Sequence, residues 1–308
     1  MNMKRRTFIK AGIGFGATML MPRGELFAQA QPLIQKKIPS SGESIPIIGI
    51  GTARRYEEIK NDAEKIPLRE TIQRFQELGG RVIDSSPSYG TAEAVVGELV
   101  EELKVRDSLF LATKVSLRKG GRDEGVAQIE ASFKKYRTNK IDLLAVHNLL
   151  DTDTQLKTIR EMKAAGRVRY VGITTSFDKQ YGEFEQTMKK ESLDFIQVDY
   201  ALDNRDAGDR IIPLAGDRGM AVIINLPFGR GRLFNAVQGK KLPEWAAEFD
   251  CASWAQFFLK YIVSHPAVTC AVPGMARAEY VVDNLGAARG RLPDAATRRR
   301  MEQFIDNV

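Results

Sequence analysis

Short apolar runs alternate along this chain with longer segments in which apolar residues recur every three or four positions. The runs are rich in Ile, Val and Leu and lack a polar residue at every second place, which is typical of strands covered on both faces. Eight such runs follow one another: IPIIGIG (45–51), RVIDS (81–85), LFLATKV (109–115), IDLLAVH (141–147), VRYVGIT (168–174), LDFIQVD (193–199), MAVIINL (220–226) and VTCAVPG (268–274). We therefore predict eight buried, parallel strands.

The segments between these runs have the period of amphipathic helices. The clearest are residues 68–78, 92–103, 126–136, 155–165, 182–190 and 254–263, and residues 294–308 predict a closing surface helix. Eight strand–helix units match the repeat count and the size, about 250 residues, of a (β/α)8 barrel. The sequence thus predicts an α/β fold, a (β/α)8 TIM barrel that forms a single domain.

A doubly wound open sheet is the alternative arrangement of such units. It normally carries a G-x-G-x-x-G phosphate loop after its first strand. The first run here continues into GIGTARR (49–55), which lacks that motif, so the barrel is favoured. One connection, residues 229–250, is unusually long and rich in charge and glycine. It is either a lid or second wall over a pocket, or a solvated insertion.

The first 30 residues differ from the rest of the chain. A basic head, KRRTFIK (4–10), precedes a short apolar segment at 11–21, and AQA (28–30) fits an A-x-A cleavage site. This is the pattern of a signal peptide, and R-R-x-F-I-K resembles the twin-arginine kind; the alternative is a basic amphipathic N-terminus that is retained. We predict that residues 1–30 are removed, that residues 31–308 form the barrel domain, and that the twin-arginine export machinery carries the folded protein to the periplasm or another extracytoplasmic compartment.

The net charge of +7 belongs largely to this leader. Residues 1–30 hold five of the 46 basic residues and one of the 39 acidic residues, which leaves +3 on residues 31–308. Such a small excess argues against a nucleic-acid partner. After residue 30, no stretch approaches the ~18 apolar residues of a membrane span, so no stable membrane anchor is expected. The pattern gives no prediction of the oligomeric state.

Only two cysteines, Cys251 and Cys270, are present. They form no C-x-x-C motif and no His/Cys cluster, so no metal site is predicted. In an exported protein they either pair or stay apart. Cys270, in the apolar run VTCAVPG, is expected to be a small core residue.

Three polar residues lie at or near the ends of consecutive runs. Asp84 belongs to the second run, Lys114 to the third and His147 to the fourth, and Tyr89 follows Asp84 in the next loop. Because catalytic groups of (β/α)8 barrels sit at the carboxyl ends of strands, we expect these four side chains to meet at one side of the mouth. Each residue alone also has an ordinary explanation. Asp84 is then a turn cap and Lys114 a lysine that snorkels at a strand end. His147 is then a hydrogen-bonded core histidine and Tyr89 a half-buried loop aromatic.

Together the four residues make a proton-donating site. The ordinary pKa of a phenol is about 10, too high for a ready acid at neutral pH. A lysine ammonium beside Tyr89 favours the phenolate and lowers that pKa, and a carboxylate beside the lysine keeps it charged. A neutral imidazole donates a hydrogen bond to a substrate carbonyl and orients it. No side chain supplies hydride, so the site implies a nicotinamide cofactor.

Motifs of fixed spacing surround these residues. D-x-x-x-x-Y-G and E-x-x-x-G (Asp84, Tyr89-Gly90, Glu93, Gly97), then ATKV and AVHN, follow one another between IPIIGIGT and VDN. They resemble the motifs of the aldo-keto reductases, whose Asp–Tyr–Lys–His tetrad matches Asp84, Tyr89, Lys114 and His147. The resemblance implies a (β/α)8 barrel, NAD(P)H-dependent reduction of an aldehyde or ketone to an alcohol, and Tyr89 as the proton donor.

The same resemblance implies how the cofactor is held. GIGT resembles the family's motif beside the nicotinamide, and VGITTS together with the glutamine of the sixth predicted strand resembles its carboxamide site. LPFGRGRL (226–233) resembles the family's pyrophosphate loop, and VPGMARAEYVVDN (272–284) resembles its adenosine site. The residues implied to bind the cofactor are Gly51, Thr52, Asp84, Thr174, Thr175, Gln197, Asn225, Leu226, Phe228, Arg230, Gly274, Arg277, Asp283 and Asn284.

Two departures from the family pattern concern the cofactor. Asn225 replaces the tyrosine that usually stacks on the nicotinamide, although Phe228 lies close in sequence. Gly274 and Tyr280 replace the basic residues that commonly grip a 2′-phosphate, with Arg277 nearby. NADP(H) is the expected cofactor, with NAD(H) as the alternative.

Three functions remain open at this point. The first is reduction of a small-molecule carbonyl substrate. The second is a nicotinamide-holding sensor or binding protein with little turnover, because Asn225 alters the stacking position and an exported protein has no obvious supply of reduced nicotinamide. The third is a barrel hydrolase with two carboxylates, such as Asp84 and Asp199. The sequence leaves the identity of the carbonyl open, and we expect residues 54–65, 117–122 and 229–250 to determine it.

Overall fold

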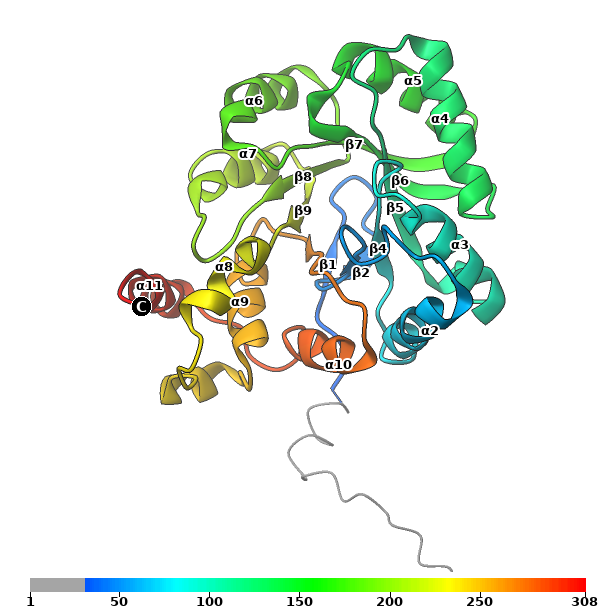
Figure 1. Ribbon diagram of the computed structural model, residues 1–308. Helices are drawn as coiled ribbons and strands as arrows, with labels where there is room; N and C mark the ends of the chain where they lie inside the picture. Colours follow the sequence, from blue (N-terminus) through cyan, green and yellow to red (C-terminus); the bar gives the residue numbers. More distant parts are fainter. Residues whose placement is uncertain (1–30) are drawn as a thin grey trace, which may run out of the picture.

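The strands of this protein gather at the centre of the molecule, with helices arranged around them (Figure 1). The computed structural model describes residues 31–308, so the predicted signal peptide lies outside the described residues. Eight parallel strands pair in chain order from β3 to β10. They are β3 (Ile50–Gly51), β4 (Val82–Asp84), β5 (Phe110–Val115), β6 (Ile141–Val146), β7 (Val168–Thr174), β8 (Phe195–Asp199), β9 (Ala221–Asn225) and β10 (Cys270–Ala271). Each of the eight predicted runs contains one of them.

The first and last strands of this sheet meet and close a cylinder. The Gly49 N–H donates to the carbonyl of Ala271 at 2.9 Å, and the Gly51 N–H donates to that of Pro273 at 2.8 Å. A Cβ atom on Gly51 would lie 2.6 Å from the carbonyl oxygen of Val272, so the close approach requires glycine. The predicted (β/α)8 barrel is confirmed, and the open doubly wound sheet is excluded.

Helices follow the strands and cover the outside of the cylinder. They are α2 (Asp62–Glu77), α3 (Ala92–Leu103), α4 (Arg122–Lys135), α5 (Thr152–Ala164), α6 (Tyr181–Lys190), α7 (Ile211–Asp217), α8 (Arg232–Ala236), α9 (Trp254–Val263), α10 (Ala278–Gly286) and α11 (Ala295–Asp306). The predicted bounds of α3 and α9 are right, and the closing helix is α11. None of the helices within residues 31–308 combines the length and the apolar character that a membrane span requires.

The largest differences from the predicted helices have local causes. α2 begins six residues early, at Asp62, because the Asn61 side chain accepts a hydrogen bond from the Glu64 N–H at 3.1 Å and caps a polar first turn. α7, α8 and α10 have seven, five and nine residues. Such short helices complete too few turns to show an apolar period.

Side chains along each strand alternate between two apolar layers. The inner cluster fills the cylinder, and the outer cluster packs against the helices; the inner one includes Val82, Phe110, Ala112, Leu143, Tyr170, Phe195, Ala221, Ile223, Cys270 and Val272. Because the period is two, the next inward positions at the strand ends are Asp84, Lys114, Gln197 and Asn225. Alternation therefore directs these polar side chains into the mouth of the barrel.

A hairpin closes the opposite end of the cylinder. β1 (Gln35–Lys37) pairs antiparallel with β2 (Ser44–Pro46). The predicted first strand, 45–51, is therefore two strands, of which only β3 belongs to the barrel. Ile38 and Ile45 are fully buried in the inner cluster. Ile45 packs into the end of the barrel, so it is apolar. In the sequence it therefore extends the apolar run of β3, and the two strands cannot be told apart.

The long connection at 229–250 serves two roles. Its first part, a 3-10 turn (Gly229–Gly231) and α8, lies at the barrel mouth, where Arg230 and Phe234 line the main cavity. Its later part, a 3-10 helix (Glu244–Phe249), packs on the outer layer, where the Trp245 ring lies 5.5 Å from that of Phe257 in α9. It is thus a pocket wall at one end and part of the outer packing at the other.

Neither cysteine takes part in a disulfide. Cys251 and Cys270 are free and buried. Cys270 belongs to the inner cluster, as expected of a small core residue.

Gly97, in the E-x-x-x-G motif, lets α3 touch α4. A Cβ atom at this position would lie 2.0 Å from the carbonyl oxygen of Lys135, whereas a Cβ atom on Gly182 in α6 would meet nothing within 4 Å. We expect Gly97→Ala to lower the free energy of unfolding by about 1–3 kcal/mol through overpacking. Gly182→Ala should leave it unchanged or raise it by up to ~1 kcal/mol. Urea denaturation of both variants measures this, and wild-type stability of Gly97→Ala would contradict the close approach.

Candidate active site

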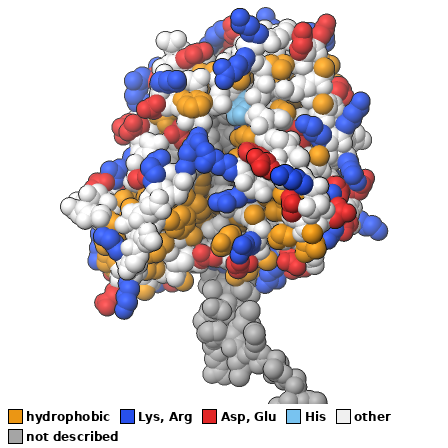
Figure 2. Space-filling model, viewed as in Figure 1, with side chains coloured by type: hydrophobic (Ala, Val, Ile, Leu, Met, Phe, Trp, Pro, Cys, Tyr) orange, Lys and Arg blue, Asp and Glu red, His pale blue; other side chains and the backbone are white. Residues whose placement is uncertain are grey.

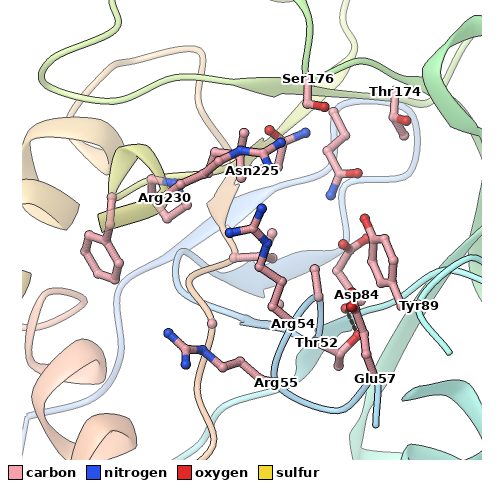
Figure 3. Close-up of a pocket in the computed structure, with 18 of the residues that line it drawn as sticks. Thr52, Arg54, Arg55, Glu57, Asp84, Tyr89, Thr174, Ser176, Asn225 and Arg230 are labelled. Carbon is pink, nitrogen blue, oxygen red and sulfur yellow. Dashed lines mark hydrogen bonds between the residues drawn. The ribbon is translucent and has the colours of Figure 1, made fainter. Parts of the chain in front are cut away.

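A cavity of about 470 Å³ opens at the carboxyl ends of the barrel strands, and Asp84, Tyr89, Lys114 and His147 all line it. Figure 2 shows a hollow on this face, with a histidine visible in it and Lys and Arg side chains gathered beside it. Figure 3 shows Tyr89 next to Asp84 on one side of the cavity. The volume lies in the usual range for small-ligand sites. The structure therefore brings the four predicted residues together.

Lys114 and Asp84 form a buried ion pair beneath the cavity. The Lys114 Nζ donates to both carboxylate oxygens of Asp84 at 2.9 Å and to the carbonyl of Ser85 at 2.7 Å, which uses all three of its protons. Lys114 is 2% exposed and Asp84 is 7% exposed. Burial lowers the pKa of Lys114, but the Asp84 carboxylate together with Tyr89 and Glu93 outweighs burial, and the pKa stands above its usual value. Lys114 is thus a fixed positive charge.

Thr52 supports this pair from the neighbouring strand end. Its N–H and its hydroxyl lie 3.1 and 3.0 Å from the carbonyl oxygen of Asp84, and its Oγ lies 2.8 Å from that of Ser85. The side chain lines the cavity, but its hydroxyl is bonded within the wall. Thr52 therefore fixes the end of β4, from which Asp84 projects.

Tyr89 lies between the charge of Lys114 and the ring of His147. The Lys114 Nζ is 5.4 Å from the centre of the Tyr89 ring, and the His147 ring stands edge-on with its centre 5.9 Å away. Burial raises the pKa of Tyr89 more than the charge of Lys114 lowers it. The prediction that Lys114 lowers the pKa of Tyr89 below its ordinary value is therefore wrong for this structure. The phenol therefore keeps its proton at neutral pH.

His147 is neutral at physiological pH, as the sequence analysis expected. Burial and the nearby charge of Lys114 lower its pKa to about 3. Its Nδ1 lies within hydrogen-bond distance of the hydroxyls of Ser86, Ser88 and Ser116. Its Nε2 has no hydrogen-bond partner among residues 31–308, so this nitrogen is left for a ligand in the cavity.

Acid should destabilise the protein through its two histidines. Burial and Lys114 lower the pKa of His147 to about 3, and burial, Arg298 and Lys36 lower that of His265 to about 4, against about 6.5 in an unfolded chain. The unfolded chain therefore binds more protons at mildly acidic pH, so this contribution to stability is complete above about pH 6.5 and is lost as the pH falls toward the folded values. Urea denaturation from neutral to acidic pH measures it. His265→Gln should flatten the slope, and an unchanged slope would count against the argument.

Most residues implied to bind the cofactor line the same cavity. They are Gly51, Thr52, Asp84, Thr174, Gln197, Asn225, Leu226, Phe228, Arg230 and Gly274. They come from six strand ends and from the turn before α8. The strand order makes this possible, because the carboxyl ends of all eight parallel strands meet at one rim.

Residues 47–302, the greater part of the chain, match the sequence model of the Aldo/keto reductase family. This chain belongs to the aldo/keto reductase family.

Individual relatives agree with this assignment. The chain is 28% identical to methylglyoxal reductase YeaE of Escherichia coli over 85% of this chain and 92% of that protein, and 28% identical to aldo-keto reductase YhdN of Bacillus subtilis over 69% of this chain and 66% of that protein. Its fold matches an aldo/keto reductase from Klebsiella pneumoniae in complex with NADP and acetate (TM-score 0.71, 23% identity, 86% of this chain and 93% of that one). It also matches the holo form of an aldo-keto reductase from Bacillus halodurans (TM-score 0.72, 20% identity, 89% and 96%).

Two predicted carboxamide ligands of this aldo/keto reductase behave differently. Thr174 lines the cavity, whereas the Thr175 hydroxyl is bonded to Gln180 Oε1 at 2.7 Å in the following turn, and Thr175 does not line it. The Thr175 carbonyl accepts a hydrogen bond from the Asn225 Nδ2 at 3.0 Å. Thr175 thus positions Asn225, the residue in place of the stacking tyrosine.

Three residues of the predicted adenosine site do not line the cavity. The Arg277 side chain is 65% exposed and lies 3.6 Å from Glu279. Asp283 accepts a hydrogen bond from Ser253, the capping residue of α9, at 2.7 Å. Asn284 is buried in α10. Asp283 thus links α10 to the start of α9, Asn284 is buried within α10, and Arg277 stands in solvent.

Two arginines of the segment 54–65, which was predicted to determine the substrate, also line the cavity but were not among the predicted cofactor-binding residues. Arg54 and Arg55 follow β3 and line the cavity together with Arg230, and none of the three forms an ion pair with a residue in 31–308. In Figure 3, Arg54 lies between Tyr89 on one side and Arg230 on the other. The usable signal was their place in GIGTARR, directly after a strand end at the mouth.

A nicotinamide dinucleotide fits the residues present. Gln197 lines the cavity, and its Nε2 is a buried donor without a partner among the described residues. Unpaired buried donors are rare in native proteins, and this one suits the oxygen of a nicotinamide carboxamide. Arg54, Arg55 and Arg230 supply unpaired positive charge for phosphates.

The cavity does not support the hydrolase interpretation. The two carboxylate oxygens of Asp84 are both bonded to Lys114. The carboxylate of Asp199 accepts hydrogen bonds from Tyr181 at 3.1 Å and Asn204 at 2.8 Å, and Asp199 does not line the cavity. Within residues 31–308, no pair of free carboxylates therefore faces a substrate across the cavity, as glycoside hydrolysis requires.

Proposed function

We propose that this protein is an NADPH-dependent reductase that converts an aldehyde or ketone to an alcohol. The carrying observation is the placement of the Tyr89 phenol in one cavity between the buried Lys114–Asp84 pair and the neutral His147. A cofactor-holding sensor would not need a buried charge beneath a tyrosine, so that alternative is not favoured.

The residues of the site divide the reaction between them. When bound, reduced nicotinamide supplies hydride to the carbonyl carbon. The carbonyl oxygen then gains negative charge, and Tyr89 passes its proton to it. Lys114 stabilises the resulting phenolate through space, and Asp84 keeps Lys114 charged and in place. His147 orients the carbonyl oxygen through its free Nε2.

The purified protein tests this proposal with NADPH and a panel of aldehydes and ketones. Methylglyoxal is the first substrate to try, because relatives from Escherichia coli and Salmonella typhi carry the name methylglyoxal reductase. Saturable NADPH oxidation that depends on the carbonyl is the expected result. Tight NADPH binding without turnover on any carbonyl would favour the sensor instead.

Arg55 supports NADP(H) over NAD(H). A Cβ atom on Gly274 would lie 3.4 Å from the Cγ of Arg55, so this arginine packs where the family's motif carries a basic residue. We expect Arg55→Ala to raise the KM for NADPH about 10- to 100-fold, the effect of losing a charge-assisted hydrogen bond, and to change that for NADH little. Arg277→Ala is the matched control. A larger effect of Arg277→Ala would indicate that Arg277, and not Arg55, binds the 2′-phosphate.

We also propose that the protein is exported by the twin-arginine machinery. KRRTFIK and AQA in the first 30 residues support this, and cleavage after Ala30 removes none of the described strands or helices, since β1 begins at Gln35. Cell fractionation and N-terminal sequencing of the mature protein test the proposal, with Gln31 as the expected first residue. Arg5→Lys with Arg6→Lys should keep the protein in the cytoplasm, and a wild-type protein retained there would overturn the proposal.

A further inference from the structure

Three serines from two loops surround one ring nitrogen of His147. The Oγ atoms of Ser86 and Ser88, after β4, lie 3.2 and 3.4 Å from Nδ1, and that of Ser116, after β5, lies 3.1 Å away. Within residues 31–308, no carbonyl or carboxylate is bonded to this nitrogen. Such groups only accept hydrogen bonds and so fix a proton on Nδ1. Hydroxyls both donate and accept, so they leave Nδ1 free to be an acceptor.

The hydroxyl protons of these serines need acceptors, and Nδ1 is one. The Oγ atoms of Ser86 and Ser88 lie 2.9 Å apart, so they share one proton, and the Ser88 N–H approaches the Ser86 Oγ at 3.3 Å. The Ser116 hydroxyl has Nδ1 as its single partner in the described part of the chain. With a proton on Nδ1, the Ser116 proton would have no protein acceptor. With Nδ1 bare, that proton is bonded.

We infer that Ser116, assisted by Ser86 and Ser88, keeps Nδ1 of His147 unprotonated and places the single proton of the neutral ring on Nε2, facing the substrate carbonyl. Ser116 is thus a positioning residue for the reduction. The opposite tautomer would present a lone pair to the carbonyl oxygen and repel it. The catalytic consequence rests on the proposed function, whereas the tautomer can be measured without it.

The chain has only two histidines, which makes the tautomer readable by NMR of protein labelled with nitrogen isotope in histidine. His265 is an internal reference, because its Nδ1 accepts a hydrogen bond from the Ala267 N–H at 3.2 Å and is therefore bare. His265→Gln assigns the signals. At neutral pH we expect a pyridine-type Nδ1 and a pyrrole-type Nε2 for His147. A pyrrole-type Nδ1 at His147 would overturn the inference.

Serine variants connect the tautomer to the reaction. The Ser116 N–H donates to Gln128 Oε1 at 2.6 Å, so the loop is anchored without the hydroxyl. In the double variant Ser86→Ala/Ser116→Ala, the Nδ1 signal should move toward the pyrrole type. We expect kcat to fall about five- to tenfold, the worth of one hydrogen bond. Restoring a hydroxyl with Ser116→Thr in place of Ser116→Ala should return both values toward the wild type.

Ser176→Ala is the matched control for the nitrogen shifts, because Ser176 lines the same cavity and makes no hydrogen bond to His147. Unchanged His147 shifts in the double alanine variant would overturn the inference, even in an active reductase. A shifted tautomer with an undiminished kcat would overturn the positioning role. If the wild type reduces no carbonyl, the proposed function fails, and the nitrogen shifts still decide whether the serines set the tautomer.

Discussion

Replacing Tyr89 with phenylalanine should lower kcat/KM for carbonyl reduction by about 100- to 10,000-fold, the range that a positioned general acid contributes. The change removes a single oxygen atom. The phenyl ring can keep its place 5.4 Å from the Lys114 Nζ and edge-on to His147. The residues that suit the nicotinamide are untouched, so the Kd for NADPH should stay the same. NADPH oxidation gives the rate, and a fluorescence titration gives the Kd.

Tyr56→Phe is a matched control for this experiment. Tyr56 is fully buried, its hydroxyl has no hydrogen-bond partner in the described chain, and it does not line the cavity. Removing that hydroxyl should leave the rate and the stability near their wild-type values. Equal rates for Tyr89→Phe and wild type would eliminate Tyr89 as the proton donor. A loss of NADPH binding in Tyr89→Phe would assign its effect to the cofactor.

The second large effect is expected at the buried ion pair. Lys114→Met leaves the Asp84 carboxylate, which is 7% exposed, without its partner. Breaking a buried pair in this way typically costs about 3–5 kcal/mol of unfolding free energy. Carbonyl reduction should be lost as well, because no positive charge remains to stabilise the Tyr89 phenolate. Urea denaturation and NADPH oxidation measure the two effects separately.

A double variant separates the two roles of this pair. Asp84→Asn with Lys114→Met removes both charges together, and replacing a buried pair by neutral groups is often close to neutral for stability. We expect most of the lost stability to return while the activity stays absent. The pair would then be retained for proton transfer and not for folding. A double variant as unstable as Lys114→Met would contradict this separation.

The strand ends of the barrel could be predicted because two features of the sequence agree there. The apolar runs locate the strands, and alternation along them directs Asp84 and Lys114 inward at the mouth. The hairpin could not be recognised in the same way, because Ile45 plugs the cylinder and extends the apolar run of the neighbouring strand. A sequence does not distinguish burial within a sheet from burial beneath it.

The predicted binding residues that do not line the cavity lie beyond the strand ends, in loops or in α10, where alternation along a strand no longer directs a side chain. Thr175 follows β7 directly, yet its hydroxyl turns to Gln180. Arg277 was predicted to bind the cofactor because of its place in a motif. The arginine that packs against Gly274 is instead Arg55, from another loop. The pKa of Tyr89 shows a related limit. The sequence names the charged neighbour that lowers it, but the burial that outweighs this effect exists only in three dimensions.

The closure of the barrel has a consequence for the newborn chain. Gly49 pairs with Ala271, and at the usual synthesis rates of about 5–20 residues per second the early strand waits roughly ten to forty seconds for its partner. During that time its edge is unpaired, and an open edge is a template for aggregation. Val272 and Gly274 line the cavity, so the cavity likewise lacks one wall until the segment after β10 has been made. If the proposed export of the folded protein holds, the signal peptide, which is synthesised first, must not engage the export machinery until β10 has been added.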